Sequence, residues 1–468
     1  MTDTKQQWNE EYDVVVIGSG FAGLAAAIEA KQAGSSVVVL EKMTIPGGNS
    51  AISGGLLAVA GSPLQERDDI SDSSELMFAD MMKAGLGINH PPLARLVAEK
   101  SVETLRWTLS LGVEYKDNLN HLGGHSVPRT YNTTCGTGSG ILQPLLTKCR
   151  ELNIAIQLKT KFRTFISNDE RQVEGVAVTR DSLISNDEVG TPVTIRARKA
   201  VVMACGGFGN DVNFRLTQDP RLTEVVDSTN HRGATAEGLV AALQIGALPI
   251  HLSWIQLGPW ASFDEKGWGV GSIFTMLAGF PYGIMVDAKN GKRFVNEMSD
   301  RRLRTDAMLF DDRIPVAIVD SLGVQHATTL EKCIKRGVVQ KFNTLEELAI
   351  YNSIPLFELK ETLERYRLSI LHGRDIEFGK PLSKDLRPIE TPPYYSIRLQ
   401  PKVHHCMGGV QINEQAQVIS LPDYQPISGL YAAGEITGGV HGASRLGSNA
   451  IVDCLVFGRI AGRSAAAD

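Results

Sequence analysis

The sequence lacks the features that would define a membrane, haem or nucleic-acid-binding protein. No apolar run among its 468 residues approaches the ~18 that a transmembrane helix needs. Its six cysteines form neither a CxxC pair nor a CxxCH motif, so we expect no metal centre and no attached haem. The net charge of −5 argues against nucleic-acid binding. The polar first 13 residues do not resemble a secretory signal, so we expect a cytoplasmic protein unless an export signal has been removed.

The composition is that of a globular protein with an excess of glycine. Hydrophobic residues make up 43% and charged residues 21%, which argues against disorder. The 46 glycines are about a tenth of the chain, above the usual ~7%. Such an excess indicates tight turns and places where the backbone approaches a ligand closely.

The amino-terminal segment has the pattern of a dinucleotide-binding unit. Residues 12–17 are an apolar run typical of a buried parallel strand, and they lead into a glycine turn. Gly18 allows the tight turn, Gly20 lets the backbone approach a pyrophosphate, and Gly23 lets the next helix pack on the strand. A second strand ends at Glu41, which is placed to accept hydrogen bonds from ribose hydroxyls.

A second glycine-rich loop after Glu41 favours FAD over NAD as the cofactor. This loop, residues 42–55, suits a chain that wraps an extended cofactor with a bulky ring at its far end. A later buried strand ends in paired glycines, where the backbone could again approach the cofactor. The cofactor-binding residues expected in these loops are Lys42, Gly48, Asn49, Ser50, Gly54, Gly55 and Gly207.

The middle of the chain alternates between helical and aromatic segments. Helices are expected near residues 75–113, 235–246 and 343–372. Three of the five tryptophans fall within residues 251–283. We expect this aromatic stretch either to form the core of a second domain or to line an apolar substrate pocket.

The densest chemical pattern lies near the carboxyl terminus. Residues 403–410 read VHHCMGGV, and residues 429–450 read GLYAAGEITGGVHGASRLGSNA. Glu435 could accept hydrogen bonds from ribityl hydroxyls. The turn that opens the last helix, with Ser448, Asn449 and Ala450, could face the flavin with its N–H groups. Together with the amino-terminal motif, these segments resemble the flavoprotein subunits of the fumarate reductase/succinate dehydrogenase family, in its soluble flavocytochrome c branch without the haem domain.

The resemblance implies a fold, a domain division and a cofactor. The fold class is α/β: a Rossmann-type FAD-binding domain with an inserted α+β cap domain. Mapped here, residues 1–252 and 405–468 form the FAD-binding domain, and residues 253–404 form the cap. In membrane-bound succinate dehydrogenases, a histidine at the position of Asn49 bonds covalently to FAD. Asparagine cannot form that bond, so non-covalent FAD is expected.

The resemblance also implies catalytic residues. Family members pass a hydride from flavin N5 to one carbon of an activated C=C bond, while an acid protonates the other carbon. His404 and Arg445 match the family's pair that grips one substrate carboxylate, and Arg445 also borders the turn expected at the flavin. Glu297 and Arg301 match an acid–base pair that relays protons. His405 should face the opposite side of its strand from His404.

Two departures from the family pattern affect the expected substrate. Where the family has a histidine before a proline, this chain has Gly258 before Pro259, so the second carboxylate clamp is lost. The family's proton-donating arginine aligns with Gly323. The alternative proton donors are Arg302, Arg304, Arg313 and Tyr282.

We therefore expect an FAD-dependent oxidoreductase that acts on a CH–CH or C=C bond next to a carboxylate or carbonyl, as an enoate or enone reductase. A dicarboxylate would leave one charge unpaired, at a cost on the order of several kcal/mol, so the substrate should have a single carboxylate or carbonyl end. Two alternatives stay open: a dehydrogenase of a ketosteroid-like or other apolar carbonyl substrate, and a non-catalytic flavin-binding electron-transfer subunit. Electrons would pass to or from a separate partner, which is a cytochrome, a nicotinamide or oxygen.

Overall fold

The computed structural model describes residues 7–181 and 190–468, and the chain divides into two compact units. Unit 1 consists of Met1–Arg221, His231–Ile255 and His405–Asp468. Unit 2 consists of Leu222–Asn230 and Gln256–His404. The short segment 222–230 belongs to unit 2 because its backbone follows that of Val403: Val403 N donates to Asp227 O, and Thr229 N donates to Val403 O, both at 2.9 Å. The expected domain division, by contrast, includes this segment in the FAD-binding domain.

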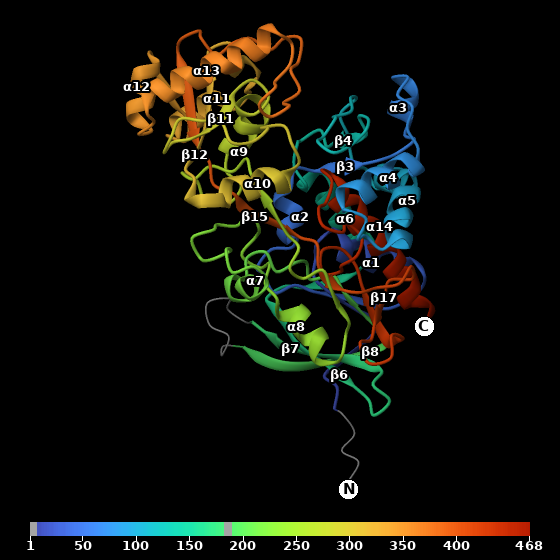
Figure 1. Ribbon diagram of the computed structural model, residues 1–468. Helices are drawn as coiled ribbons and strands as arrows, with labels where there is room; N and C mark the ends of the chain where they lie inside the picture. Colours follow the sequence, from blue (N-terminus) through green and yellow to red (C-terminus); the bar gives the residue numbers. More distant parts are fainter. Residues whose placement is uncertain (1–6, 182–189) are drawn as a thin grey trace. The chain divides into compact units, whose positions relative to one another are not determined.

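Unit 1 is built on a largely parallel sheet in the order β17-β18-β8-β1-β2-β5. β7 pairs antiparallel with the first half of the long strand β8, and β6 pairs with β7 (Figure 1). The strands of this sheet are β1 (Glu10–Ile17), β2 (Val37–Leu40), β5 (Ala155–Gln157), β6 (Thr160–Ser167), β7 (Val173–Arg180), β8 (Thr191–Met203), β17 (Gln417–Ile419) and β18 (Pro426–Ala432).

The predicted strand–turn–helix unit is present, and with it the Rossmann-type fold is confirmed. β1 ends in four buried residues, Val14–Ile17, and pairs in parallel with both β2 and β8. Gly18 follows with a φ of +105°, in the region that favours glycine. The helix α1 (Phe21–Gln32) then begins. Glu41 comes directly after β2, at the carboxyl edge of the sheet.

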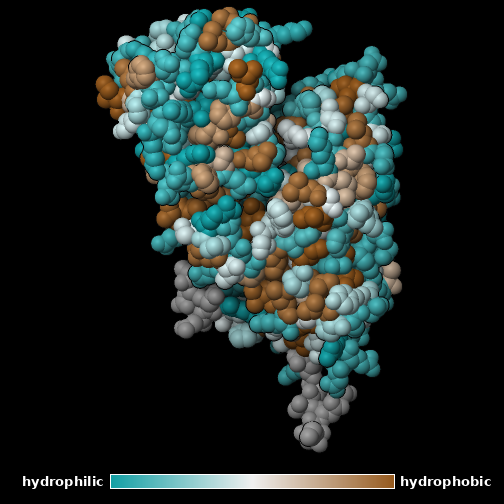
Figure 2. Space-filling view, in the orientation of Figure 1, coloured by the Kyte–Doolittle hydropathy of each residue, from teal (hydrophilic) through white to brown (hydrophobic). Residues whose placement is uncertain are grey.

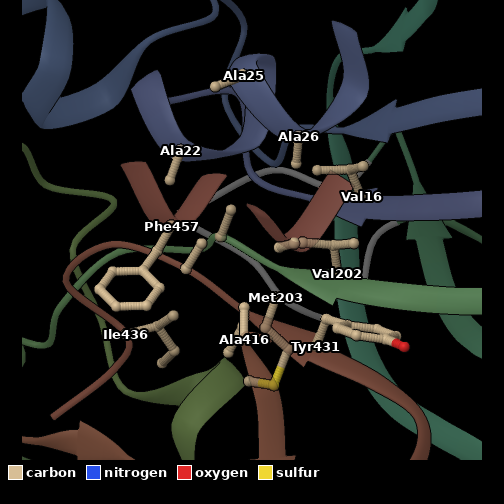
Figure 3. Packing of buried hydrophobic residues seen from close by; sticks show 14 of the residues in the cluster. Val16, Ala22, Ala25, Ala26, Val202, Met203, Ala416, Tyr431, Ile436 and Phe457 are labelled. Carbon is tan, nitrogen blue, oxygen red and sulfur yellow. The ribbon is translucent and has the colours of Figure 1, made fainter. Parts of the chain in front are cut away.

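Helices cover this sheet and close its core. Figure 3 shows Ala22 and Ala26 of α1 in one cluster with Val16, Val202 and Phe457, which come from β1, β8 and α14 (Asn449–Ala467). The other helices of unit 1 are α2 (Gly48–Ile52), α3 (Pro63–Arg67), α4 (Ser74–Ala84), α5 (Pro91–Ser110), α6 (Ser139–Glu151), α7 (Val212–Gln218) and α8 (Glu237–Gln244). Its short strands are β3 (Leu56–Ala58), β4 (Thr130–Asn132), β9 (Pro249–Ile250) and β16 (Gly409–Val410).

Unit 2 has an antiparallel sheet in the order β11-β12-β14-β13. These strands are β11 (Ile284–Asp287), β12 (Pro315–Asp320), β13 (Gln340–Phe342) and β14 (Tyr394–Arg398). The helices are α9 (Gly271–Phe274), a π-helix (Thr275–Gly279), α10 (Arg301–Leu309), α11 (Leu330–Lys335), α12 (Leu345–Tyr351) and α13 (Leu356–Leu371), with 3₁₀ turns at Phe310–Asp312 and Gly323–His326. Two further strands, β10 (Ile255–Gly258) and β15 (Lys402–Cys406), lie at the ends of its main segment.

Most of the aromatic stretch that the sequence singled out contributes to the core of unit 2. Trp260, Phe274 and Phe280 are buried in one hydrophobic cluster, whereas the Phe263 side chain is exposed. In the face that Figure 2 shows, the surface of α12 and α13 is mostly hydrophilic, and hydrophobic residues appear there as separate groups.

Within residues 7–181 and 190–468, every helix is too short or too polar to cross a membrane.

Candidate functional site

A cavity in unit 1 lies where the strands β1, β2 and β8 end and α1 begins. In doubly wound α/β folds, ligands bind beyond the carboxyl ends of the strands. Eight predicted cofactor-binding residues line this cavity: Gly18, Gly20, Glu41, Lys42, Gly48, Asn49, Ser50 and Glu435. The paired glycines after β8 also reach it, but through Gly206 rather than the predicted Gly207.

The acidic residue after β2 is held in place by the glycine turn. The Glu41 carboxylate accepts hydrogen bonds from Ser19 N at 3.2 Å and from Met43 N at 2.8 Å. The Ser19 hydroxyl also donates to it, and Ser19 Oγ in turn accepts from Gly47 N at 3.0 Å. A carboxylate has about four lone-pair sites and three are already used, so Glu41 retains about one for a ribose hydroxyl.

The second loop joins the glycine turn to the rest of unit 1. Ser50 Oγ accepts a hydrogen bond from Phe21 N, the first residue of α1, at 2.9 Å. A Cβ at Gly20 would lie 3.1 Å from this oxygen, so a side chain there would crowd the turn. Asn49 Oδ1 accepts from His231 N at 2.6 Å, and its side chain also hydrogen-bonds to Glu435. The position that is a covalent attachment site in some family members is thus engaged in hydrogen bonds here.

The cavity wall carries a charged cluster that the sequence does not predict. Lys42 Nζ lies 2.7 Å from Glu237 Oε2, and Lys161 Nζ lies 2.9 Å from Glu237 Oε1. Lys42 also donates to Thr235 Oγ1 at 2.6 Å. These partners are more than 100 residues apart from Lys42, so no local motif could have revealed them.

Glu435 and Arg445 are two ionisable groups that are withdrawn from water and influence each other electrostatically. Burial raises the pKa of Glu435 to about 7, although the charge of Arg445 and hydrogen bonds from Cys406 N and Asn49 oppose this shift. Burial likewise lowers the pKa of Arg445 to about 10, against the opposing charge of Glu435. His405 Nδ1 lies 3.4 Å from Glu435 Oε1, so this histidine contacts a residue of unit 1. Arg445 keeps its charge at neutral pH and donates to Leu446 O at 2.9 Å.

Residues of the segment 121–130 form hydrogen bonds with the turn before α14. His125 Nε2 hydrogen-bonds to Gly447 O at 2.7 Å, and burial lowers the pKa of His125 to about 4, so a neutral ring donates. Thr130 Oγ1 lies 2.7 Å from Ser448 Oγ. Ser448 has a φ of +64°, which turns the chain into α14.

Asn449, the first residue of α14, provides a test of the cofactor assignment. Its side chain is fully buried, and neither amide atom has a hydrogen-bond partner among the described residues. A buried amide without partners is costly, and a polar ligand would satisfy it. The glycine turn, Glu41 and Glu435 in the cavity lining, with Asn449 beyond it, make a set of polar groups that fits an FAD.

The remaining predicted cofactor residues lie outside the lining of the cavity. Gly23 has a packing role, because a Cβ there would lie 1.9 Å from Gly18 O. Gly207 leaves room for the Glu435 side chain, because a Cβ at residue 207 would lie 2.6 Å from Glu435 Oε1. The others are Gly54, Gly55, Arg445, Ser448, Asn449 and Ala450.

Unit 2 gathers a second polar cluster around Trp260. His404 and Trp268 pack against the indole with ring centroids 5.4 and 5.7 Å away. The Arg301 guanidinium stacks on the indole 4.6 Å from its centre and donates to Gln256 Oε1 at 3.2 Å. His404 Nδ1 lies 2.8 Å from Thr229 Oγ1. We name these six residues the Trp260 cluster. His404 and Arg445 belong to different units, and their predicted pairing stays a prediction.

The contacts of Glu297 favour a structural role over the predicted proton relay. Its buried carboxylate accepts from Arg293 Nη2 at 2.8 Å and from Met285 N at 3.0 Å, and Lys380 Nζ lies 3.8 Å away. A carboxylate held by two cations in the core of unit 2 is poorly placed to exchange protons. Arg301, its predicted partner, stacks on Trp260.

The surroundings of Gly323, where the family's arginine is absent, and of Tyr282, a candidate proton donor, bear on the source of the proton. A Cβ at Gly323 would lie 2.4 Å from the Val319 side chain and 3.0 Å from that of Tyr282, so an arginine would not fit there. The Tyr282 hydroxyl donates to Asp385 at 2.9 Å, and its ring stacks on His326. Its withdrawal from water and the Asp385 charge raise the pKa of Tyr282, which makes it a weaker acid.

Comparisons with known proteins agree with this geometry. Residues 13–451 match the family model described as an FAD binding domain. The chain is 44% identical to the acrylate reductase flavoprotein subunit of Shewanella woodyi, over 98% of this chain and 92% of the relative. It is 34% identical to a fumarate reductase (cytochrome) of Shewanella frigidimarina, over 98% of this chain and 77% of the relative. Among solved structures, the open conformation of a flavocytochrome c3 fumarate reductase is similar, with a TM-score of 0.83 and 33% identity. The match covers 98% of this chain and 79% of the chain in that structure.

Proposed function

Since this chain belongs to the family of FAD-binding flavoproteins that includes the fumarate and acrylate reductases, and is an FAD-dependent oxidoreductase of the CH–CH class, we propose that it reduces the C=C bond of a small enoate with a single carboxylate, such as acrylate. The observation that supports this substrate class is the Trp260 cluster. It combines a histidine and an arginine with two indoles. Gly258, against the Trp260 ring, stands where the family resemblance implies a second carboxylate-binding histidine.

The residues of the chain divide the chemistry between them. FAD, when bound in the cavity of unit 1, supplies the hydride for one carbon of the double bond. His404 and Arg445 bind the substrate's carboxylate, which withdraws electrons from the double bond. Arg301 donates the proton to the other carbon and is reprotonated from solvent. Its position on the Trp260 indole, beside His404, favours it over Arg302, which lies 3.7 Å from Asp306, and over Arg313, which donates to Ala307 O.

The test is reoxidation of the reduced holoenzyme under anaerobic conditions. The flavin is photoreduced and mixed separately with acrylate, cinnamate, fumarate, urocanate and an enone steroid. Rapid reoxidation by acrylate with slow reoxidation by fumarate is the expected result. Reoxidation by the steroid alone would favour the ketosteroid alternative, and reoxidation by none of them would favour an electron-transfer subunit.

Arg301→Lys tests the proton donor, with Arg302→Lys as the matched control on the same helix. Turnover of Arg301→Lys should fall by about two orders of magnitude, the usual contribution of a positioned acid. The control should retain normal turnover, because Arg302 pairs with Asp306 at the half-exposed surface of α10. Equal loss in both variants would refute the role of Arg301.

We also propose that the FAD is bound without a covalent link. Asn49 lacks a nucleophilic ring nitrogen, and its hydrogen bonds to His231 N and Glu435 support a role in shaping the cavity. Acid precipitation should release all yellow colour into the supernatant as FAD. Colour that stays in the pellet would contradict this.

A separate redox protein is the proposed electron donor. The chain has no CxxCH motif for a haem of its own, and its relative from Shewanella woodyi is named as a subunit. Stopped-flow mixing with NADH should therefore reduce the flavin slowly, whereas a reduced cytochrome should reduce it fast. Rapid reduction by NADH would overturn this assignment.

A further inference from the structure

The indole of Trp260 is buried at 2% exposure, yet its N–H has no hydrogen-bond partner among the residues that the structure describes. Buried polar groups in folded proteins nearly always have a partner, because an unsatisfied donor loses its hydration without compensation. The environment of this N–H is also unusual. The Arg301 guanidinium stacks on the same ring, and the His404 ring meets it edge to face.

The backbone beneath the indole is shaped to admit it. A Cβ at Gly258 would lie 3.0 and 3.2 Å from two carbons of the six-membered indole ring, a distance that forces a neighbour to shift. Glycine at this position therefore lets the Trp260 ring lie against the chain. The ring fills the space that a side chain at residue 258 would otherwise occupy.

From these observations we propose that Trp260 is a specificity-determining residue, whose indole N–H donates a hydrogen bond to the carboxylate or carbonyl oxygen of the substrate. The ring itself presents an apolar surface where a second carboxylate would be desolvated without a partner. A ligand with one anionic end and a short apolar end satisfies the N–H and leaves no charge against the ring. This inference rests on the proposed function for the identity of the ligand, but it concerns binding rather than turnover.

Trp260→Phe removes the N–H and keeps an aromatic ring. A hydrogen bond to a charged acceptor that is made in both the ground and transition states should appear in KM. We expect KM for acrylate to rise about ten- to hundredfold while kcat changes less than threefold. The matched control is Trp107→Phe, which removes the N–H of an indole on α5 in unit 1, outside the Trp260 cluster, and should change KM less than threefold. An unchanged KM in Trp260→Phe would overturn the proposal.

A second measurement uses the unmodified holoenzyme, so it does not depend on the folding of a variant. The chain has five tryptophans, and ¹⁵N-tryptophan labelling gives each indole N–H its own signal. Saturated propionate, which binds without reaction, should shift one indole signal downfield, and that signal should be missing in Trp260→Phe. A Trp260 signal that is unmoved by propionate would overturn the proposal.

The two proposals can fail separately. If the holoenzyme reduces acrylate while propionate leaves the Trp260 signal in place, the role of Trp260 fails and the proposed function stands. If propionate moves the signal while no enoate is reduced, the carboxylate site stands and the proposed function fails.

Discussion

At the scale of single residues, the contact between Thr229 and His404 sets which ring nitrogen of the histidine carries a proton. Val403 O already accepts from Thr229 N at 2.9 Å and from Ser228 Oγ at 3.2 Å, and a carbonyl has two lone pairs. The Thr229 hydroxyl lies farther from that oxygen, at 3.3 Å, than from His404 Nδ1, at 2.8 Å. We therefore expect the hydroxyl to donate to Nδ1, so that neutral His404 carries its proton on Nε2.

Thr229→Val tests this arrangement. Loss of a hydrogen bond worth about 1 kcal/mol should lower kcat/KM roughly fivefold. FAD content should not change, because the cofactor cavity lies within unit 1 and Thr229 lies in unit 2. Thr229→Ser keeps the hydroxyl and should restore activity. Equal activity in the valine and serine variants would show that the contact does not position His404.

Glu435 predicts a pH dependence of stability in the protein without cofactor. Its pKa is raised from 4.5 to about 7, so the folded chain binds more protons than the unfolded chain between these values. The free energy of unfolding should therefore fall as pH rises from 5 to 7, by about 1–3 kcal/mol, and then level off. Urea titrations of the apoprotein at several pH values measure this change. Glu435→Gln should remove this fall, and an unchanged slope in that variant would assign the effect to another group.

Residues whose role depends on their neighbours in the sequence were predictable. Residues whose role depends on contacts with distant parts of the chain were not. Gly18, Gly20 and Glu41 were found because a strand, a turn and a helix follow one another within 30 residues. Thr229 lies 175 residues from His404, so nothing near either residue in the sequence indicates their hydrogen bond. The crowding at Gly323 has a related cause, because the close approach of Val319 and Tyr282 is visible only in the folded chain.

At the scale of elements, the packing of α14 on α1 depends on glycine. A Cβ at Gly458 would lie 2.5 Å from Ala22 O, and one at Gly462 would lie 2.2 Å from Ala26 O. Both target oxygens belong to the backbone of α1, which cannot move without disturbing the glycine turn. The sequence predicted both helices, but it did not show that glycine sets the distance between them.

Gly458→Val should force α14 away from α1. Overpacking of this kind costs about 1–3 kcal/mol, so we expect a lower melting temperature and loss of bound flavin. Arg463→Gln is the control on the same helix, since Arg463 is exposed and pairs at 3.6 Å with Glu29. Its melting temperature should stay within about a degree of the unmodified protein, because exposed ion pairs contribute little. A stable, flavin-replete Gly458→Val protein would contradict the proposed close packing.

At the scale of the whole molecule, the cofactor should stabilise one unit more than the other. The cavity that fits FAD is lined by residues of unit 1, so added FAD should raise the unfolding temperature of that unit. At a hundredfold excess over Kd, the gain is about 2.7 kcal/mol. Calorimetry of the apoprotein with and without FAD measures the shift.

Glu41→Arg should abolish that gain. It replaces an acceptor of a ribose hydrogen bond with a cation, at a cost of about 1.5–3 kcal/mol in FAD binding. Arg302→Gln, a change on the surface of unit 2, should retain the full FAD-dependent shift. An unchanged Kd for FAD in Glu41→Arg would show that this carboxylate does not hold the ribose.

The membership of residues 222–230 in unit 2 has a consequence for domain exchange between relatives. A chimera that takes residues 256–404 from one protein and the remainder from another would pair His404 with a foreign segment, because Thr229 would come from the other parent. Val403 would also form its backbone hydrogen bonds at positions 227 and 229 with a foreign segment. A transplant of substrate specificity must therefore carry two stretches of sequence, and the shorter one is nine residues long.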